Sequence, residues 1–228
     1  QRPPAKTGAI FYNFDFKTIE FFDGNSWRQV DNTTVAGRAV FTSGPLTPGS
    51  DLSSVIDKVN ISSIGNATFF GSQTTVQQTS MAVGNTTRGI FQQGGNSSNT
   101  LEYITIPSDG NSIDYGDLSA ARYAGSGANS STRGLFMGGA PGPSNVIDYV
   151  EISTIGNALD FGDLFTGCYL TSSANSPTKA FSVGGYVSAN ITDIQVVTMS
   201  SKGNAEDFGD TDRPNSTQAG FSNSIRGI

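Results

Sequence analysis

Histidine is absent from this chain of 228 residues, and Cys168 is its single cysteine. The lack of histidine excludes the usual Ser-His-Asp and Cys-His nucleophiles and every histidine-ligated metal site. A lone cysteine excludes an intrachain disulfide and a cysteine-rich zinc site, so we expect Cys168 to be a small buried hydrophobic residue. We therefore expect a protein without a catalytic residue, a metal site or a cofactor.

Charge and long apolar runs are also scarce. Charged residues make up 14% of the chain, the formal net charge is −6, and the 13 lysines and arginines are scattered. A phosphate-backbone binder needs clustered basic side chains, so we expect no nucleic-acid partner. No apolar run approaches the roughly 18 residues of a membrane helix, so we expect no membrane insertion.

Four residue types dominate the composition. Glycine, serine, threonine and asparagine account for 97 of the 228 residues, beside 15 phenylalanines. The four types are middling to poor helix formers, whereas the phenylalanines supply apolar side chains for a core. The composition predicts an all-β protein of packed strands and many turns.

Two motifs recur along the chain with one period. The first is a basic residue and a short apolar strand that ends in glycine, and it begins at Arg38, Arg88, Arg133 and Lys179. Its later copies close in paired glycines that end at Gly95, Gly139 and Gly185. The second motif is Gly-Asn followed by an aromatic strand, and it begins at Gly65, Gly110, Gly156 and Gly203, in steps of 45, 46 and 47 residues.

Each unit has room for about four short strands. The third strand of each unit is expected at 55–61, 101–106, 146–152 and 191–199, and Gly-Asn suits the tight turn that follows it. A period of about 45 residues with four strands per unit predicts a β-propeller, whose stacked blades bury the faces that one blade cannot. We assign a small N-terminal β-module to residues 1–32 and propeller repeats to 33–228, as units 33–80, 81–127, 128–173 and 174–228.

The units resemble kelch repeats over about residues 33–228. The resemblance rests on the apolar strand, the double glycine, a variable loop and a strand that carries Tyr103 or Tyr149. It departs from the kelch pattern at the late tryptophan, where Tyr115, Phe161 or Phe208 stands between Asp and Gly. This variant is similar to kelch-like arrays in structural proteins of tailed marine bacteriophages, which implies a kelch-like propeller on a virion.

The N-terminal segment carries a second resemblance. Tyr12-Asn13 precedes an aromatic strand and the turn Asp23-Gly24-Asn25, which Trp27 follows, and this pattern predicts three strands joined by tight turns. It is similar to a short β-module of tail-fibre and other virion proteins. That resemblance implies an attachment segment.

The ends of the repeat array leave two interpretations open. The first unit lacks its leading strand, whereas residues 217–224 form a candidate leading strand before the first motif restarts at Arg226. This strand either completes the first blade of a four-bladed ring or belongs to a longer array. The restarted motif favours the longer array, and Gln1 in place of methionine indicates processing or a longer protein.

Recurring polar residues are the first candidates for chemistry. Asp114, Asp160 and Asp207 would suit acid–base work or calcium, and Arg88 and Arg133 would suit an acidic glycan. They recur in register with the repeat, whereas catalytic sites in propellers are usually asymmetric. We therefore assign them, with the paired glycines, to turns and to bracing between blades.

The loops after the double glycines are the second candidates. They differ in length and sequence while the frame does not, and they span 45–54, 96–99, 140–145 and 186–190. Binding sites commonly lie on variable loops of a rigid frame. The alternative is that these loops are turns that tolerate sequence change and have no binding role. The candidate residues for binding a partner or glycan are Asn96, Asn99, Pro141, Asn145, Tyr186 and Asn190.

Together these features favour a non-enzymatic virion structural protein in a phage tail fibre, appendage or surface decoration. Its propeller is expected to bind a host cell-surface receptor or glycan, with other virion proteins and further copies in a homo-oligomer as partners. A structural spacer or decoration without a receptor is one alternative. A secreted bacterial adhesin at the cell surface and a glycan depolymerase with paired carboxylates are others.

Overall fold

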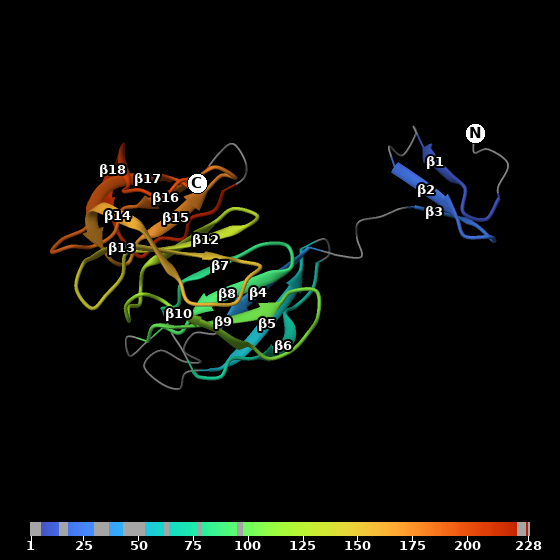
Figure 1. Cartoon of the computed structure of the whole chain (residues 1–228), viewed down its shortest axis with the longest axis horizontal. Coiled ribbons are helices and arrows are strands. Elements are labelled where there is room, and N and C mark those ends of the chain that lie inside the picture. The colour runs from blue at the N-terminus through green and yellow to red at the C-terminus, as the bar shows by residue number, and fades with distance from the viewer. Residues whose placement is uncertain are drawn as a thin grey trace. The chain divides into compact units, whose positions relative to one another are not determined.

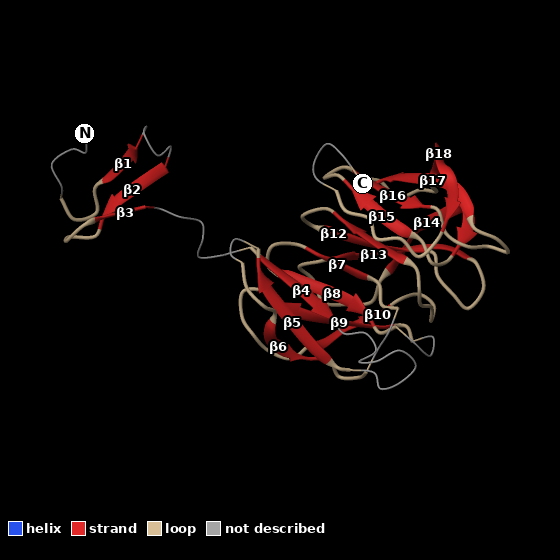
Figure 2. Cartoon of the chain, turned by 180° about the vertical axis from the view of Figure 1, so that it is seen from behind, coloured by secondary structure: helices blue, strands red, loops and turns tan. Residues whose placement is uncertain are grey.

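Strands, turns and loops make up all of the chain that the structure describes, without a helix (Figure 2). The computed structural model describes residues 6–13, 18–29, 37–42, 53–61, 64–76, 79–94, 98–222 and 227. Within these ranges no helix is long and apolar enough to cross a membrane. Contacts divide the chain into two compact units, Gln1–Ala39 with Val59–Asn66, and Val40–Lys58 with Ala67–Ile228. The predicted all-β class is confirmed.

The N-terminal strands form a three-stranded antiparallel sheet, β1 (Ile10–Asn13), β2 (Thr18–Phe22) and β3 (Trp27–Gln29). Asp23 closes the turn between β2 and β3, because its Oδ1 accepts hydrogen bonds from the amides of Asn25 at 2.8 Å and Ser26 at 2.7 Å. The Trp27 ring packs on Phe11 and Phe22, with centroids 6.0 and 5.7 Å apart. The predicted three-stranded module is confirmed.

Four antiparallel sheets are arranged as the blades of a β-propeller, which confirms the predicted architecture (Figure 1). The first blade has the described strands β4 (Arg38–Thr42), β5 (Val55–Asn60) and β6 (Thr68–Ser72). The second has β7 (Ala82–Gly84), β8 (Arg88–Gln92), β9 (Thr100–Thr105) and β10 (Ile113–Asp117). The third has β11 (Ser126–Asn129), β12 (Arg133–Met137), β13 (Ser144–Glu151) and β14 (Leu159–Cys168). The fourth has β15 (Ser172–Asn175), β16 (Lys179–Val183), β17 (Ile191–Thr198) and β18 (Glu206–Asn215).

The last strand of every blade carries a β-bulge at the same repeat position. In β14 the register passes from Asp160 to Gly162 on successive residues of β13, so Phe161 is the extra residue. The equivalent extra residues are Phe70, Tyr115 and Phe208. A bulge twists its strand and re-aims a side chain, and here the glycine after the aromatic residue has a φ of +149° at Gly162.

The bulge glycines of the first three blades each receive the Gly-Asn segment of the next blade. Between the second and third blades, the Gly156 N–H donates to the Tyr115 C=O at 2.9 Å. The Asp117 N–H donates to Asn157 Oδ1 at 3.0 Å, and the Asp117 C=O accepts from the Ala158 N–H at 2.7 Å. We call these three bonds the inter-blade ladder. The same ladder joins the first blade to the second through residues 110–112, and the third to the fourth through residues 203–205.

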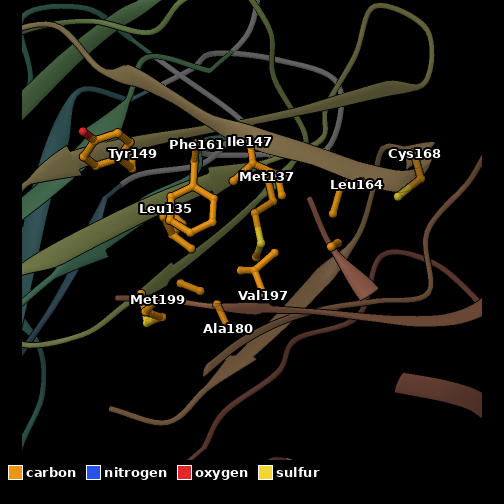
Figure 3. Close-up of a cluster of buried hydrophobic side chains, with 12 residues drawn as sticks. Leu135, Met137, Ile147, Tyr149, Phe161, Leu164, Cys168, Ala180, Val197 and Met199 are labelled. Atoms are coloured by element: carbon orange, nitrogen blue, oxygen red, sulfur yellow. The ribbon is translucent and has the colours of Figure 1, made fainter. Parts of the chain in front are cut away.

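Apolar side chains fill the space between consecutive blades. In the cluster between the third and fourth blades, β12 and β13 contribute Leu135, Met137 and Ile147, which pack with Ala180 and Val197 (Figure 3). Similar buried clusters lie between the earlier blades. Cys168 belongs to the cluster of Figure 3 and is buried, which confirms its prediction as a small hydrophobic residue.

We expect Gly116→Ala to weaken the contact between the second and third blades. A Cβ on Gly116 would lie 2.6 Å from the carbonyl carbon and oxygen of Gly156, at a φ of +140°. The free energy of unfolding, measured with urea, should fall by about 1–3 kcal/mol. Gly156→Ala is the matched control, because its φ is +155° but no atom lies within 4 Å of the added Cβ. Equal losses in the two variants would contradict a role for close backbone approach.

Candidate functional site

The variable loops lie at one end of the blade strands. Because neighbouring strands are antiparallel, the connections after the double glycines share this end with the connections that lead to the next blade. Tyr123 accordingly bridges Ala140, and Tyr169 bridges Tyr186. We call residues 119–125, 138–145, 169–171 and 184–190 the loop rim. The Gly-Asn turns lie at the opposite end of the same strands.

The double glycines give the third and fourth blades the same loop frame. The second glycine of each pair has a positive φ, +126° at Gly139 and +119° at Gly185. The Gly139 N–H donates to the Cys168 C=O at 2.9 Å, and the Gly185 N–H donates to the Asn215 C=O at 2.8 Å. The C=O of each glycine accepts a bond of 3.0 Å from the first residue of the next strand. Gly95 lies outside the described residues.

The predicted binding residues of these two loops lie between the double glycine and the start of the next strand, where Asn145 is the second residue of β13. Pro141 and Asn145 are exposed in the third blade, and Asn190 is exposed in the fourth. Asn190 bridges Tyr186, whose half-buried ring lies against Tyr169 with centroids 5.4 Å apart. The structure thus places Tyr186 and Asn190 together in one loop, and Pro141 and Asn145 together in the other.

The two predicted asparagines of the second blade are not part of this pair of loops. Asn99 is half-buried, and its C=O accepts a hydrogen bond from the Leu118 N–H at 2.7 Å. Asn96 lies outside the described residues. The Asn99 backbone is therefore used within its own blade.

Two tyrosines of the loop rim are not among the residues predicted from the sequence. Tyr123 and Tyr169 are half-buried, and each exchanges two backbone hydrogen bonds with the loop that follows a double glycine, at 2.7–2.9 Å for Tyr123 and 2.8–3.2 Å for Tyr169. Each precedes a residue with a left-handed φ, +56° at both Ala124 and Leu170. The sequence signal that could have identified Tyr123 and Tyr169 is their separation by one repeat.

The left-handed residues also link the blades. The Ala124 N–H donates to the Thr79 C=O at 3.1 Å, and the Leu170 N–H donates to the Ala124 C=O at 2.6 Å. The Thr217 N–H continues the series with a bond of 2.8 Å to the Leu170 C=O. We call this series the rim hydrogen-bond chain. It ties the bases of the rim connections together, so the loop tips stand on a fixed backbone.

The repeated charged residues lie away from the loop tips. Asp114, Asp160 and Asp207 are exposed on the last strands of their blades. Arg88 Nη1 donates to the Ile152 C=O at 2.8 Å, and the Arg88 guanidinium lies 4.5 Å from the Tyr103 ring centroid.

Arg133 repeats this arrangement one blade later. Its Nη1 donates to the Met199 C=O at 2.7 Å, and its Nη2 lies 2.8 Å from Glu151 Oε1. Its guanidinium lies 4.7 Å from the Tyr149 ring centroid. Both arginines therefore connect one blade to the backbone of the next.

A buried ion pair lies beneath the loop rim. Arg122 Nη2 is 3.1 Å from Asp148 Oδ2, with side chains 3% and 0% exposed. Ser119 donates to the same Oδ2 through its N–H and hydroxyl, at 3.0 and 2.9 Å, and Arg122 donates to the Phe136 C=O at 3.0 Å. Burial lowers the pKa of the Arg122 guanidinium, and the Asp148 carboxylate opposes that shift.

The loop rim carries groups that can bind a ligand. In the described ranges, no three His, Cys, Asp or Glu side chains gather as metal ligands. What the rim presents is tyrosine rings, a proline and the amides of Asn145 and Asn190. Comparisons of the sequence with protein-family models and with curated proteins found no match.

We expect Asp148→Asn to destabilise the fold strongly. The substitution keeps the shape of the side chain but leaves the Arg122 charge buried without its partner. Removing one member of a buried pair costs roughly 3–5 kcal/mol in the free energy of unfolding, which urea denaturation measures. Asp160→Asn, at an exposed position, is the control and should change stability by less than about 0.5 kcal/mol. A small effect at Asp148 would contradict the assigned pairing.

The Cys168 thiol is expected to be inert in the folded protein. Burial raises its pKa to about 12, with the Asp193 charge acting in the same direction. At pH 8 its reaction with a thiol reagent should be slower than that of an ordinary cysteine by about a thousandfold, because the thiolate is the reactive form. The same protein unfolded in urea should react at the ordinary rate. Fast labelling without urea would show that the site opens.

Proposed function

We propose that this chain is a non-enzymatic structural protein of a tailed-phage virion, in a tail fibre, an appendage or a surface decoration. We further propose that its loop rim binds a host cell-surface glycan or receptor. The observation that carries the proposal is the pair of loops 138–145 and 184–190, which share one glycine frame, differ in sequence and contain no charged residue.

The chemistry of the rim fits a neutral, hydroxyl-rich ligand. The side-chain amides of Asn145 and Asn190 each carry donors and an acceptor that match sugar hydroxyls. The rings of Tyr169 and Tyr186 are half-buried, so they offer an apolar face at little cost in side-chain entropy. The absence of charge in the two loops favours a neutral glycan over an acidic one.

The virion location rests on resemblance. The repeats resemble kelch-like arrays of phage structural proteins, and the N-terminal sheet with its Asp23-Gly24 turn resembles a module of tail-fibre proteins. Several copies on one fibre would add weak contacts through a high effective concentration. A weak site on each propeller is therefore sufficient for attachment.

Two buried acids support the non-enzymatic part of the proposal. Hydrolysis of a glycosidic bond needs two carboxylates that face the substrate. Asp148 is fully buried against Arg122, and Glu102 is 1% exposed and accepts bonds from Ser112 at 2.6 Å and Gln93 at 2.7 Å. Both carboxylates are engaged within the fold.

A paired assay tests the proposal. Labelled protein is incubated with candidate bacterial cells, and their purified surface polysaccharide is assayed for new reducing ends in the presence of the protein. We expect saturable binding without release of reducing ends. The double variant Asn145→Ala/Asn190→Ala should weaken binding by about tenfold or more, as expected for the loss of two direct polar contacts.

The matched control is Ser153→Ala/Pro177→Ala, two exposed positions in turns at the opposite end of the strands. It should leave binding unchanged. Release of reducing ends would contradict the non-enzymatic assignment. A lack of binding across a broad panel of hosts would contradict receptor binding and favour a structural spacer.

A further inference from the structure

One face of the N-terminal sheet is apolar and exposed. The register pairs Ile10 with Phe21 and Tyr12 with Ile19, so these four side chains lie together on one face of β1 and β2. Their exposed fractions are 73% for Ile10, 44% for Tyr12, 48% for Ile19 and 38% for Phe21. We call these four residues the apolar face. Single exposed hydrophobic side chains are common on proteins, whereas four neighbours on one face indicate an interaction surface.

The opposite face of the same sheet is already packed. Trp27 lies against Phe11 and Phe22. Asn13 Nδ2 donates to Glu20 Oε1 at 3.2 Å, and the two polar residues are 6% and 5% exposed. The usual alternation in an antiparallel sheet places polar side chains outside and apolar side chains inside. Here a polar pair is buried while apolar side chains face outward, and a partner that covers the apolar face would account for this inversion.

The distribution of charge favours a second copy of the chain as that partner. Residues 1–32 contain four basic and four acidic residues, whereas residues 33–228 contain nine basic and fifteen acidic residues. The net charge of −6 therefore belongs to the propeller repeats, which repel one another between copies. None of the four side chains of the apolar face is charged, and Arg28 of β3 pairs with Phe21 at its edge. Two copies can meet at this face without burying a carboxylate.

We propose that the apolar face packs on the same face of a second copy of this chain. The interface is isologous, and the two sheets form a two-layer sandwich. From strand spacing and rise, each sheet measures roughly 10 by 13 Å. That is smaller than the roughly 800 Å² per partner of a standard interface, so the dimer is weak and depends on concentration. The inference is independent of glycan binding by the loop rim.

Sedimentation equilibrium of the full chain over a range of concentrations tests the proposal. We expect a reversible monomer–dimer equilibrium. Ile10→Glu should raise the dissociation constant at least about tenfold, because dimerisation would then remove a carboxylate from water. The variant should fold, since Ile10 is 73% exposed. Ile155→Glu is the matched control: it adds the same charge at a position 55% exposed in the third blade, and it should leave the dissociation constant unchanged.

The salt dependence of the dimer separates an apolar interface from an ion-paired one. Added salt screens the repulsion between two acidic propellers and leaves an apolar contact intact. The dissociation constant should therefore fall or stay constant as salt is raised. A dissociation constant that rises steeply with salt would contradict the proposal.

Two further outcomes would overturn the proposal. A monomer at every concentration would show that the apolar face is covered by another part of the chain or by a different protein. Ile19→Glu, on the central strand of the sheet, is a second variant that should weaken the dimer as Ile10→Glu does. A dimer that persists unchanged in both variants would place the interface elsewhere, and an equal loss in Ile155→Glu would do the same.

Discussion

The close approach of a bulge glycine to the Gly-Asn segment of the next blade is the contact on which the propeller depends. No Cβ fits between Gly116 and Gly156, so the two backbones bond directly. This contact holds the bulged aromatic residue against the next blade, where Tyr115 is 1% exposed and Phe161 is 2% exposed. The apolar clusters follow from it, because blades at a fixed offset can interdigitate their side chains to native density.

The ladder also explains why side chains can vary more at one end of the strands than at the other. At the Gly-Asn end, backbone and side chain are both committed to a neighbouring blade, as Asn157 shows by accepting the Asp117 N–H. At the loop rim, backbone groups of Gly139 and Gly185 form the hydrogen bonds that fix each loop. The loop residues that follow each glycine contribute little to these bonds. Side chains such as Pro141 and Asn190 can therefore vary without loss of the fold, which is the condition for a binding surface.

The period of the two motifs was enough to predict the blades, because every interface needs the same Gly-Asn segment and the same aromatic strand. The bulge was not predictable, since a register shift depends on the partner strand and leaves no mark beyond Asp-aromatic-Gly. Strand ends also moved: the strand expected at 146–152 ends at Glu151, and the Ile152 C=O instead accepts a bond from Arg88. Tyr123 and Tyr169 were missed because they pair with loops distant in sequence.

One position of the third strand shows how the frame accepts unlike side chains. Glu102, Asp148 and Gln195 are equivalent and buried, and each accepts a backbone N–H from the end of the preceding blade, either its last strand or the connection that follows it. The fold thus requires an oxygen acceptor here and not a charge, since neutral Gln195 forms the link at 3.0 Å, as Asp148 does. The Arg122 charge balances the carboxylate that stands at this place in the third blade. An unrepeated buried ion pair is therefore explained by packing, and it does not by itself indicate catalysis.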